Sequence, residues 1–281
     1  MTWHKCIKII NELEKNLEDI DKATLNWMEL QSEINSEDHI VPYHVKKIIS
    51  LLNLKNNSYI LDHGCGNGKT LIYLLARGFL NIKGVDVSKN GLKYNNFLLK
   101  LLNLNDPVFF SYQGNELPFK NNYFDFIYSQ QVLEHVEDSY IDDFFTEENR
   151  VLKLEGITYH QIPHLLVPYE SHVKIWFAHW LPLFLHNFIY RMNNIDINYF
   201  HKNIFLRSSY FFLKKLRSNI GFTKNISKER FLDHNEISYY DGNIFLRKLI
   251  QKLFLIPLIG KILLNMLVIF TMLETVSIKK I

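Results

Sequence analysis

A glycine-rich segment, residues 62–68 (DHGCGNG), limits the folds open to this chain more than any other feature. It follows a short apolar run at residues 58–62 and precedes residues 69–77, which read as a helix ended by Gly78. Glycines between a strand and a helix let the backbone approach a ligand closely, and the first turn of the helix offers unpaired N–H groups. The segment therefore predicts a ligand-binding turn at the carboxyl end of a strand.

Strands and helices alternate along the chain as far as Pro163. This alternation implies crossover connections and a parallel sheet with helices on both faces. Two further strands, one after Gly221 and one at residues 275–280, would bring the number to seven. We therefore expect an α/β fold with a doubly wound, mostly parallel, seven-stranded sheet. The first five strands are expected at residues 58–62, 82–87, 108–112, 124–129 and 157–162, and the helices between and after them at 69–77, 88–102, 140–152 and 208–218.

The chain shows no internal repeat and no linker rich in Gly, Ser or Pro, so residues 1–281 are expected to form a single domain. Helical spacing over residues 5–34 assigns 1–40 to an N-terminal helical extension. Residues 164–205 are dense in aromatic and histidine side chains, and they are expected to be an insertion over the carboxyl ends of the strands. Residues 246–273 are expected to form an apolar helical segment before the last strand.

Composition excludes several classes of protein. Of the 281 residues, 47% are hydrophobic and 22% are charged, as in globular proteins. The net charge of +3 disfavours a nucleic-acid partner, and two cysteines suit a reduced, cytoplasmic setting. Residues 1–150 carry 15 basic and 21 acidic side chains, whereas residues 151–281 carry 17 and 8. The basic half could meet an anionic substrate or membrane surface, or its charges could simply be solvated.

One apolar run is long enough to raise the question of a membrane span. Residues 253–273 are mostly apolar, but Pro257, Gly260 and Lys261 interrupt them, and a lysine near the bilayer centre costs about 2.5–3.5 kcal/mol. A helix pair broken between Pro257 and Gly260 is expected instead. This pair would either pack on the core or touch the inner face of the membrane, so a peripheral contact through residues 246–273 stays open.

Nucleotide ligands of two kinds fit the glycine segment poorly. A phosphate-binding loop for triphosphates needs a glycine where this chain has His63, and a dinucleotide loop needs its third glycine one residue after Gly68. A second acidic residue, Asp86, ends the next expected strand 22 residues after Gly64. A carboxylate in that position can accept hydrogen bonds from both hydroxyls of a ribose.

The pattern Asp-x-Gly-x-Gly-x-Gly, the acidic Asp86 and residues 117–136 (LPFKNNYFDFIYSQQVLEHV) resemble class I S-adenosylmethionine-dependent methyltransferases. Within that class they are similar to the branch that methylates quinones, lipids, sugars and other metabolites. The resemblance is strong over residues 40–163 and weaker over 205–281, and it implies a Rossmann-like sheet. Residues 164–205 share only a loose likeness with family members.

The resemblance implies which residues bind the cofactor, S-adenosylmethionine. The acidic strand end and the loop would hold its methionine part. Asp86 would hold its ribose hydroxyls, and Val87 would pack on its adenine. Gln113 stands where the family usually has an aspartate that contacts the adenine amino group, and Asn115 is a rival for this role. Gln130 matches the position closest to the methyl-bearing sulfur. The loop residues concerned are Asp62, Gly64, Cys65, Gly66 and Gly68.

A sugar hydroxyl is a poor nucleophile, so its methylation benefits from a general base. The candidate bases are His164, Glu170, His172 and His179, with Glu170 and His172 as a possible oriented pair. Glu170, His172 and His179 could also bind a divalent metal, but their spacing fits no strong metal motif, so no resident metal is expected. His135, which follows the fourth expected strand, is interpreted first as structural.

The sequence thus predicts a methyltransferase acting on a sugar oxygen of a cell-surface glycan or its lipid-linked precursor. A quinone or another small metabolite is the alternative acceptor. A cofactor-binding module without transfer activity is the alternative of another class, and the intact loop with both aspartates argues against it. The expected partners are a small-molecule or a glycan or lipid-linked acceptor, with no nucleic acid.

Overall fold

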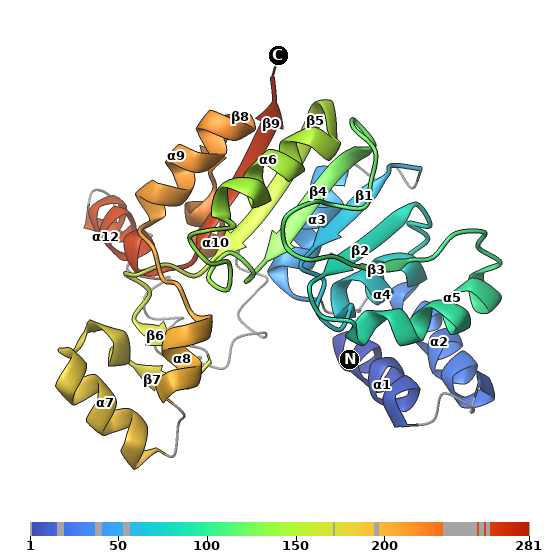
Figure 1. Ribbon diagram of the computed structural model, residues 1–281, viewed down its shortest axis with the longest axis horizontal. Helices are drawn as coiled ribbons and strands as arrows, with labels where there is room; N and C mark the ends of the chain where they lie inside the picture. The colour runs from blue at the N-terminus through green and yellow to red at the C-terminus, as the bar shows by residue number, and fades with distance from the viewer. Residues whose placement is uncertain are drawn as a thin grey trace. The chain divides into compact units, whose positions relative to one another are not determined.

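Four consecutive parallel strands carry the glycine loop and the segments next to it. Strand β1 (Ile60–His63) pairs with β2 (Ile82–Asp86) on one side and with β4 (Phe124–Gln130) on the other, and β2 pairs with β3 (Phe109–Ser111). Every residue of β1 is buried, as expected for a central strand covered on both faces. The computed structural model shows these strands side by side (Figure 1), and it describes residues 2–15, 20–36, 41–52, 57–170, 172–193, 197–232, 252, 256 and 259–280.

The sheet contains seven strands in the order β3-β2-β1-β4-β5-β9-β8 within the described residues. The expected doubly wound α/β architecture is therefore confirmed. The remaining strands of this sheet are β5 (Leu152–Ile162), β8 (Gly221–Asn225) and β9 (Leu273–Lys279). The helices of the sheet layers are α3 (Tyr43–Leu52), α4 (Lys69–Ala76), α5 (Asn95–Leu102), α6 (Ile141–Val151), α9 (Ser209–Asn219), α10 (Ser227–Leu232) and α12 (Ile259–Leu267), with 3₁₀ turns η1 (Asn90–Tyr94) and η4 (Val268–Phe270).

The chain divides into two units, each with its own packing. The first comprises Met1–Ser129, Thr146–Tyr159 and Ile278–Ile281, and the second comprises Gln130–Phe145 and His160–Ser277. The glycine loop belongs to the first unit, and the expected insertion belongs to the second.

The N-terminal segment packs on the helix that follows the glycine loop. It forms two helices, α1 (Thr2–Lys15) and α2 (Ile20–Ile34), within the stretch expected to be helical. Both contact α4, whose residues Thr70–Ala76 are all buried. The buried side chains of α1 and α2 include Cys6, Ile9, Ile10, Trp27 and Leu30. These helices therefore cover the outer face of α4.

Two other boundaries differ from expectation. The helix expected from residue 88 begins as the 3₁₀ turn η1 and becomes α-helical only at Asn95. Strand β5 starts at Leu152, five residues before the expected position, and includes Glu155 at a φ of 61°. Lys153 and Glu155 interrupt the apolar run there, so the sequence pattern identifies only the buried end of this strand.

The segment expected as an insertion, residues 164–205, has a small core of its own. It contains a hairpin of β6 (Tyr169–Glu170) and β7 (Ile175–Trp176), the turn η2 (Ala178–Trp180), and helices α7 (Leu183–Met192) and α8 (Ile197–Asn203). Tyr190, Phe200 and Ile204 form a buried cluster. By contrast, three aromatic side chains are exposed: the ring of Trp176 contacts that of Phe177, and the ring of Phe177 contacts that of Trp180.

The apolar tail is described only in part. Pro257 lies outside the described residues, so the expected break between Pro257 and Gly260 does too, whereas Gly260 is in α12. Ile262, Met266 and Ile269 are exposed. In the described part of the chain, none of the helices has the length and apolar character that a membrane span requires.

A buried ion pair secures the end of β1 beside the loop. His63 Nδ1 lies 2.9 Å from Glu148 Oε1 of α6, and its Nε2 lies 2.9 Å from the Tyr112 hydroxyl. The side chains of His63 and Glu148 are 1% and 0% exposed. Removing one partner of such a pair leaves the other buried without its charge partner, which is costly.

We expect Glu148→Ala to lower the free energy of unfolding by about 3–5 kcal/mol, because His63 would lose its buried carboxylate. Urea denaturation of both proteins measures the difference. The control is Glu29→Ala, whose carboxylate is 59% exposed and 3.6 Å from Lys5 Nζ, and whose loss should cost less than about 1 kcal/mol. Equal effects of the two substitutions would contradict the importance assigned to the buried pair.

Candidate functional site

The glycine loop joins β1 to α4 through left-handed backbone. Gly66 has a φ of 54° and Gly68 a φ of 76°, a conformation that side chains with a Cβ rarely adopt. A Cβ on Gly68 would lie 2.3 Å from the Phe109 ring, whereas a Cβ on Gly66 would meet no atom within 4 Å. Gly68 is therefore required for packing, and Gly66 borders open space in which a ligand can approach the backbone.

Asp86 ties the end of β2 to this loop. Its Oδ2 accepts a hydrogen bond of 2.8 Å from the Gly66 N–H, and its Oδ1 accepts one of 2.8 Å from the Ser88 N–H. A carboxylate can accept about four hydrogen bonds. Two lone pairs thus remain, one on each oxygen, which suits a pair of neighbouring hydroxyls such as those of a ribose.

Asp62, at the end of β1, is a buried carboxyl group with a raised pKa. Asp62 is only 5% exposed. Burial raises the pKa of Asp62 to about 7, the Tyr128 hydroxyl opposes the rise, and the negative charge of Asp86 adds to it. A buried carboxylate of this kind is stabilised by a cation. The chemistry of the site therefore fits a ligand that combines an ammonium group with a ribose diol, as S-adenosylmethionine does.

Cys65 contributes packing to the loop. A Cβ on Gly84 of β2 would lie 2.9 Å from Cys65 Sγ and 2.6 Å from a Leu71 methyl carbon. Burial raises the pKa of the Cys65 thiol well above its ordinary value, and the carboxylates of Asp62 and Asp86 add to the rise. The thiol therefore stays protonated and fills the space that Gly84 leaves.

The residues expected at the adenine are exposed. Val87 is 65% exposed, which leaves its side chain available for contact with a flat ring. Gln113 and Asn115 are both exposed and flank Gly114, whose φ is 93°. The geometry places both beside the same turn and does not choose between them.

Gln130 lies in the second unit, in a chain of amide and carboxylate groups. Its Nε2 donates to Gln161 Oε1 at 3.1 Å, and Gln161 Nε2 donates to Glu274 Oε1 at 2.8 Å. Glu274 is fully buried. These hydrogen bonds fix the orientation of the Gln130 amide.

Three of the four candidate bases line one small cavity of the second unit, namely His164, Glu170 and His179. His164 Nε2 donates to the Thr271 carbonyl at 2.8 Å, and its Nδ1 accepts from the Leu166 N–H at 3.3 Å. Burial lowers the pKa of His164, and the hydrogen bond to Thr271 opposes this. His179 Nε2 lies 3.1 Å from the Leu165 carbonyl oxygen. Both nitrogens of His164 are thus engaged with the backbone.

Glu170 and His172 form a hydrogen-bonded pair. Glu170 Oε1 lies 2.6 Å from His172 Nδ1, and Glu170 Oε2 accepts from the Val173 N–H at 2.8 Å. Burial favours a higher pKa for Glu170, but the hydrogen bonds from His172 and Val173 outweigh it and lower the pKa. The hydrogen bond with Glu170 raises the pKa of His172, although burial opposes the rise.

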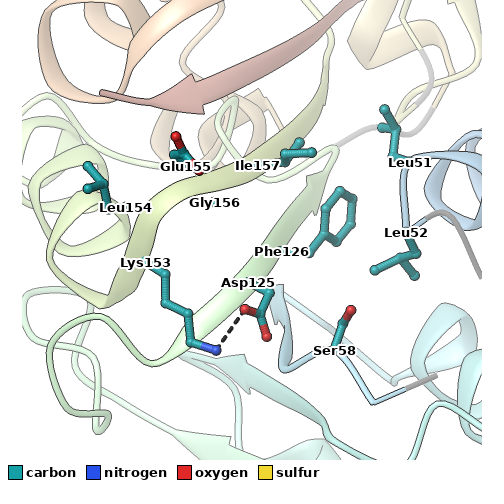
Figure 2. A pocket seen from close by; sticks show the side chains of 10 residues that line it. All are labelled: Leu51, Leu52, Ser58, Asp125, Phe126, Lys153, Leu154, Glu155, Gly156 and Ile157. Atoms are coloured by element: carbon teal, nitrogen blue, oxygen red, sulfur yellow. Dashed lines mark hydrogen bonds and ion pairs between the residues drawn. The ribbon is translucent and has the colours of Figure 1, made fainter. Parts of the chain in front are cut away.

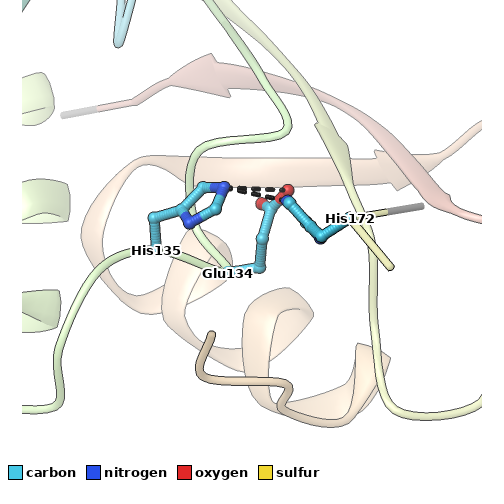
Figure 3. A group of neighbouring side chains, drawn as sticks. All are labelled: Glu134, His135 and His172. Carbon is cyan, nitrogen blue, oxygen red and sulfur yellow. Dashed lines mark hydrogen bonds and ion pairs between the residues drawn. The ribbon is translucent and has the colours of Figure 1, made fainter. Parts of the chain in front are cut away.

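Two residues outside the expected catalytic set, Glu134 and His135, meet His172 (Figure 3). His135 Nε2 lies 3.1 Å from His172 Nε2. Burial raises the pKa of Glu134 to about 8, its own backbone and His172 oppose the rise, and Glu170 adds to it. The sequence predicts a structural role for His135, and nothing in the spacing predicts a partner 37 residues away.

A separate pocket lies at the amino ends of the strands, opposite the end that carries the glycine loop (Figure 2). It is formed by the amino ends of β4 and β5 and by the end of α3, and Lys153 Nζ pairs with Asp125 Oδ1 across it at 2.7 Å. Ligands of parallel α/β sheets bind at the carboxyl ends of strands. This pocket is therefore not the site formed by the glycine loop.

Comparisons with known proteins agree with the loop geometry. Residues 61–160 match the family described as "Methyltransferase domain". The chain is 27% identical over 93 residues to 27-O-demethylrifamycin SV methyltransferase of Amycolatopsis mediterranei (strain S699), which covers 33% of this chain and 34% of that protein. It is 29% identical over 112 residues to Methyltransferase GfsG of Streptomyces halstedii, with 40% of each covered. The chain thus spans well under half of either relative.

A solved structure, that of MccD protein, matches 85% of this chain and 96% of its own, with a TM-score of 0.50 and 14% sequence identity. This likeness concerns the fold alone. The matched residues 61–160 contain all of β1 but its first residue, the glycine loop and Asp86. Residues 61–160 therefore carry a methyltransferase domain.

Proposed function

We propose that the protein is an enzyme that transfers a methyl group from S-adenosylmethionine to a sugar oxygen of a cell-surface glycan or its lipid-linked precursor. The observation that carries methyl transfer is the presence of two carboxyl groups at one glycine loop with left-handed backbone. The buried Asp62 precedes the loop, and Asp86 accepts a hydrogen bond from the Gly66 N–H. When bound, the cofactor supplies an activated methyl group. The chain's own residues have to bind it, orient the acceptor and remove the acceptor's proton.

On this proposal, each cofactor-binding residue has a distinct partner. Asp62 pairs with the ammonium of the methionine part, and Asp86 accepts from the two ribose hydroxyls while it stays bound to the Gly66 N–H. Val87 packs on the adenine, and Gln113 or Asn115 accepts from its amino group. Gln130 lies at the sulfur, held by its hydrogen bond to Gln161.

Of the four candidate bases, the Glu170–His172 pair is the one proposed to activate the acceptor. Glu170 accepts from His172 Nδ1 and so directs Nε2 of the ring away from itself. In the transfer, the acceptor oxygen bonds to the methyl carbon as the carbon–sulfur bond breaks, and the hydroxyl proton leaves to a base. Positioning of the two reactants supplies most of the acceleration, and a base adds roughly 10²–10⁴-fold.

The sugar acceptor is supported by two exposed surfaces of the second unit. Trp176, Phe177 and Trp180 form an exposed row of aromatic rings that could stack on a sugar. Ile262, Met266 and Ile269 expose apolar side chains on α12 and η4 that could meet a lipid anchor. The alternative acceptor is a small metabolite, which the name of the rifamycin-related methyltransferase favours.

We expect Asp86→Ala to weaken S-adenosylmethionine binding at least about 100-fold, because the variant loses the acceptor of the ribose hydroxyls and the bond to the Gly66 N–H. Isothermal titration calorimetry measures the dissociation constant, and thermal unfolding verifies that the variant is folded. The matched control is Asp106→Ala, an exposed aspartate that should bind like the wild type. Retained tight binding by Asp86→Ala would overturn the assignment.

Because the pKa of Asp62 is raised to about 7, protons compete with the cofactor's ammonium for this carboxylate. The affinity should therefore fall about tenfold as the pH is lowered from 8 to 6, with most of the loss below pH 7. Asp62→Asn should bind more weakly at pH 8 and lose this pH dependence. A wild-type affinity that stays constant between pH 6 and pH 8 would refute the proposed role of Asp62.

The proposed function is tested by label transfer. The purified protein and methyl-labelled S-adenosylmethionine are incubated with separated soluble and membrane extracts of a host that lacks its own copy of the protein. Label in the polysaccharide or lipid-extractable fraction, absent with Asp86→Ala, is the expected result. Label only in small soluble molecules would overturn the glycan acceptor and favour the metabolite. Cofactor binding without any transfer would favour the non-catalytic module.

A further inference from the structure

Glu134, His135 and His172 bring three groups that can bind a metal to one place. One side-chain atom from each lies within 4.8 Å of the others, and Figure 3 shows the three side chains converging. Glu134 and His135 follow β4, whereas His172 follows β6. All three belong to the second unit of the chain.

The hydrogen bonds of the two histidines determine where their ring protons lie. His135 Nδ1 is 3.0 Å from the Asn203 carbonyl oxygen, and His172 Nδ1 is 2.6 Å from Glu170 Oε1. Both partners can only accept, so Nδ1 carries the proton in each ring. Each neutral ring then has a lone pair on Nε2. The two Nε2 atoms lie 3.1 Å apart, so they can share a proton in one N–H···N hydrogen bond or bind one cation together.

Glu134 places a buried carboxyl group beside these nitrogens. It is fully buried, and neither carboxylate oxygen has a hydrogen-bond partner among the described residues. Glu134 Oε1 lies 3.9 Å from His135 Nε2. A buried carboxylate without a partner is strongly unfavourable unless a positive charge approaches it.

The segment that carries Glu134 and His135 is held in place by its backbone. The Phe205 N–H donates to the Glu134 carbonyl at 2.6 Å. The Arg207 guanidinium donates to the Leu133 carbonyl at 3.2 Å and to the Val136 carbonyl at 2.7 Å. These bonds fix the segment before any ligand binds, as a metal site requires.

We propose that Glu134, His135 and His172 bind a divalent transition-metal ion, with Zn²⁺ as the probe, through the two Nε2 atoms and a carboxylate oxygen. Two nitrogens bound to one tetrahedral zinc at about 2.0–2.1 Å lie about 3.3–3.4 Å apart, close to the separation seen here. Two imidazoles and one carboxylate suit zinc or iron(II), whereas calcium and magnesium prefer oxygen ligands alone. Glu170 orients the His172 ring from behind, as carboxylates do for metal-bound histidines.

Three protein ligands leave a fourth position open. On the function proposed above, on which this step rests, that position takes the acceptor's hydroxyl oxygen. A bound cation lowers the pKa of such a hydroxyl. With the ion bound, His172 Nε2 is a ligand and no longer a base, so the ion would replace the Glu170–His172 pair in activating the acceptor, and the hydroxyl proton would pass to solvent.

The test uses the full-length chain stripped of metal and dialysed against Zn²⁺, with Co²⁺ as a spectroscopic probe. We expect one ion per chain and visible absorption of the bound Co²⁺. Glu134→Gln and His172→Ala should each weaken Zn²⁺ binding at least about 100-fold, and Glu170→Gln should weaken it about 10–100-fold. Glu137→Gln, at an exposed glutamate of the same segment, is the matched control and should bind like the wild type.

Binding of S-adenosylmethionine verifies that each variant is folded and separates the two proposals. A chain that binds the cofactor but no Zn²⁺ would overturn the metal site and leave the proposed function standing. Equal Zn²⁺ affinity in the wild type, Glu134→Gln and His172→Ala would also overturn the site, since the ion would lie elsewhere. Zn²⁺ binding as expected, with no methyl transfer to any extract, would overturn the proposed function alone.

Discussion

Buried carboxyl groups need a positive charge or a proton donor, and this requirement governs the chemistry of the whole chain. Glu148 is hydrogen-bonded to His63, next to the loop, and Glu170 is hydrogen-bonded to His172 in the second unit. Asp62 and Glu134 are buried with raised pKa values of about 7 and about 8. The two hydrogen-bonded pairs hold the scaffold in place, and Asp62 and Glu134 are where a charged ligand gains the most.

The glycine loop and the neighbouring strand β2 determine each other's conformation. Asp86 at the end of β2 accepts from the Gly66 N–H, while Gly84 of the same strand leaves room for Cys65 of the loop. Phe109 of β3 in turn lies against Gly68. A larger side chain at any of these contacts would displace the loop from the strands. The three strands and the turn therefore act as one ligand-binding element.

Local patterns predicted the part of the fold that depends on neighbours in sequence. The apolar runs and glycines identify β1, the loop, α4 and β2, because each is delimited by its own residues. The meeting of His135 with His172 depends on the path of the chain between two residues 37 positions apart, which no local pattern specifies. For the same reason, the sequence predicts only a structural role for His135 and no role for Glu134. The choice between Gln113 and Asn115 stays a prediction, since both are exposed beside one turn.

Both cysteines of the chain are chemically quiet. Burial raises the pKa of Cys6 to about 12 and that of Cys65 well above its ordinary value. Because the thiolate is the reactive form, neither residue is suited to alkylation, oxidation or disulfide exchange at neutral pH. The loop can therefore keep its shape without a reductant. A cysteine introduced at an exposed position would react far faster than the native ones, so a fluorophore or spin label could be attached there selectively in the otherwise unaltered protein.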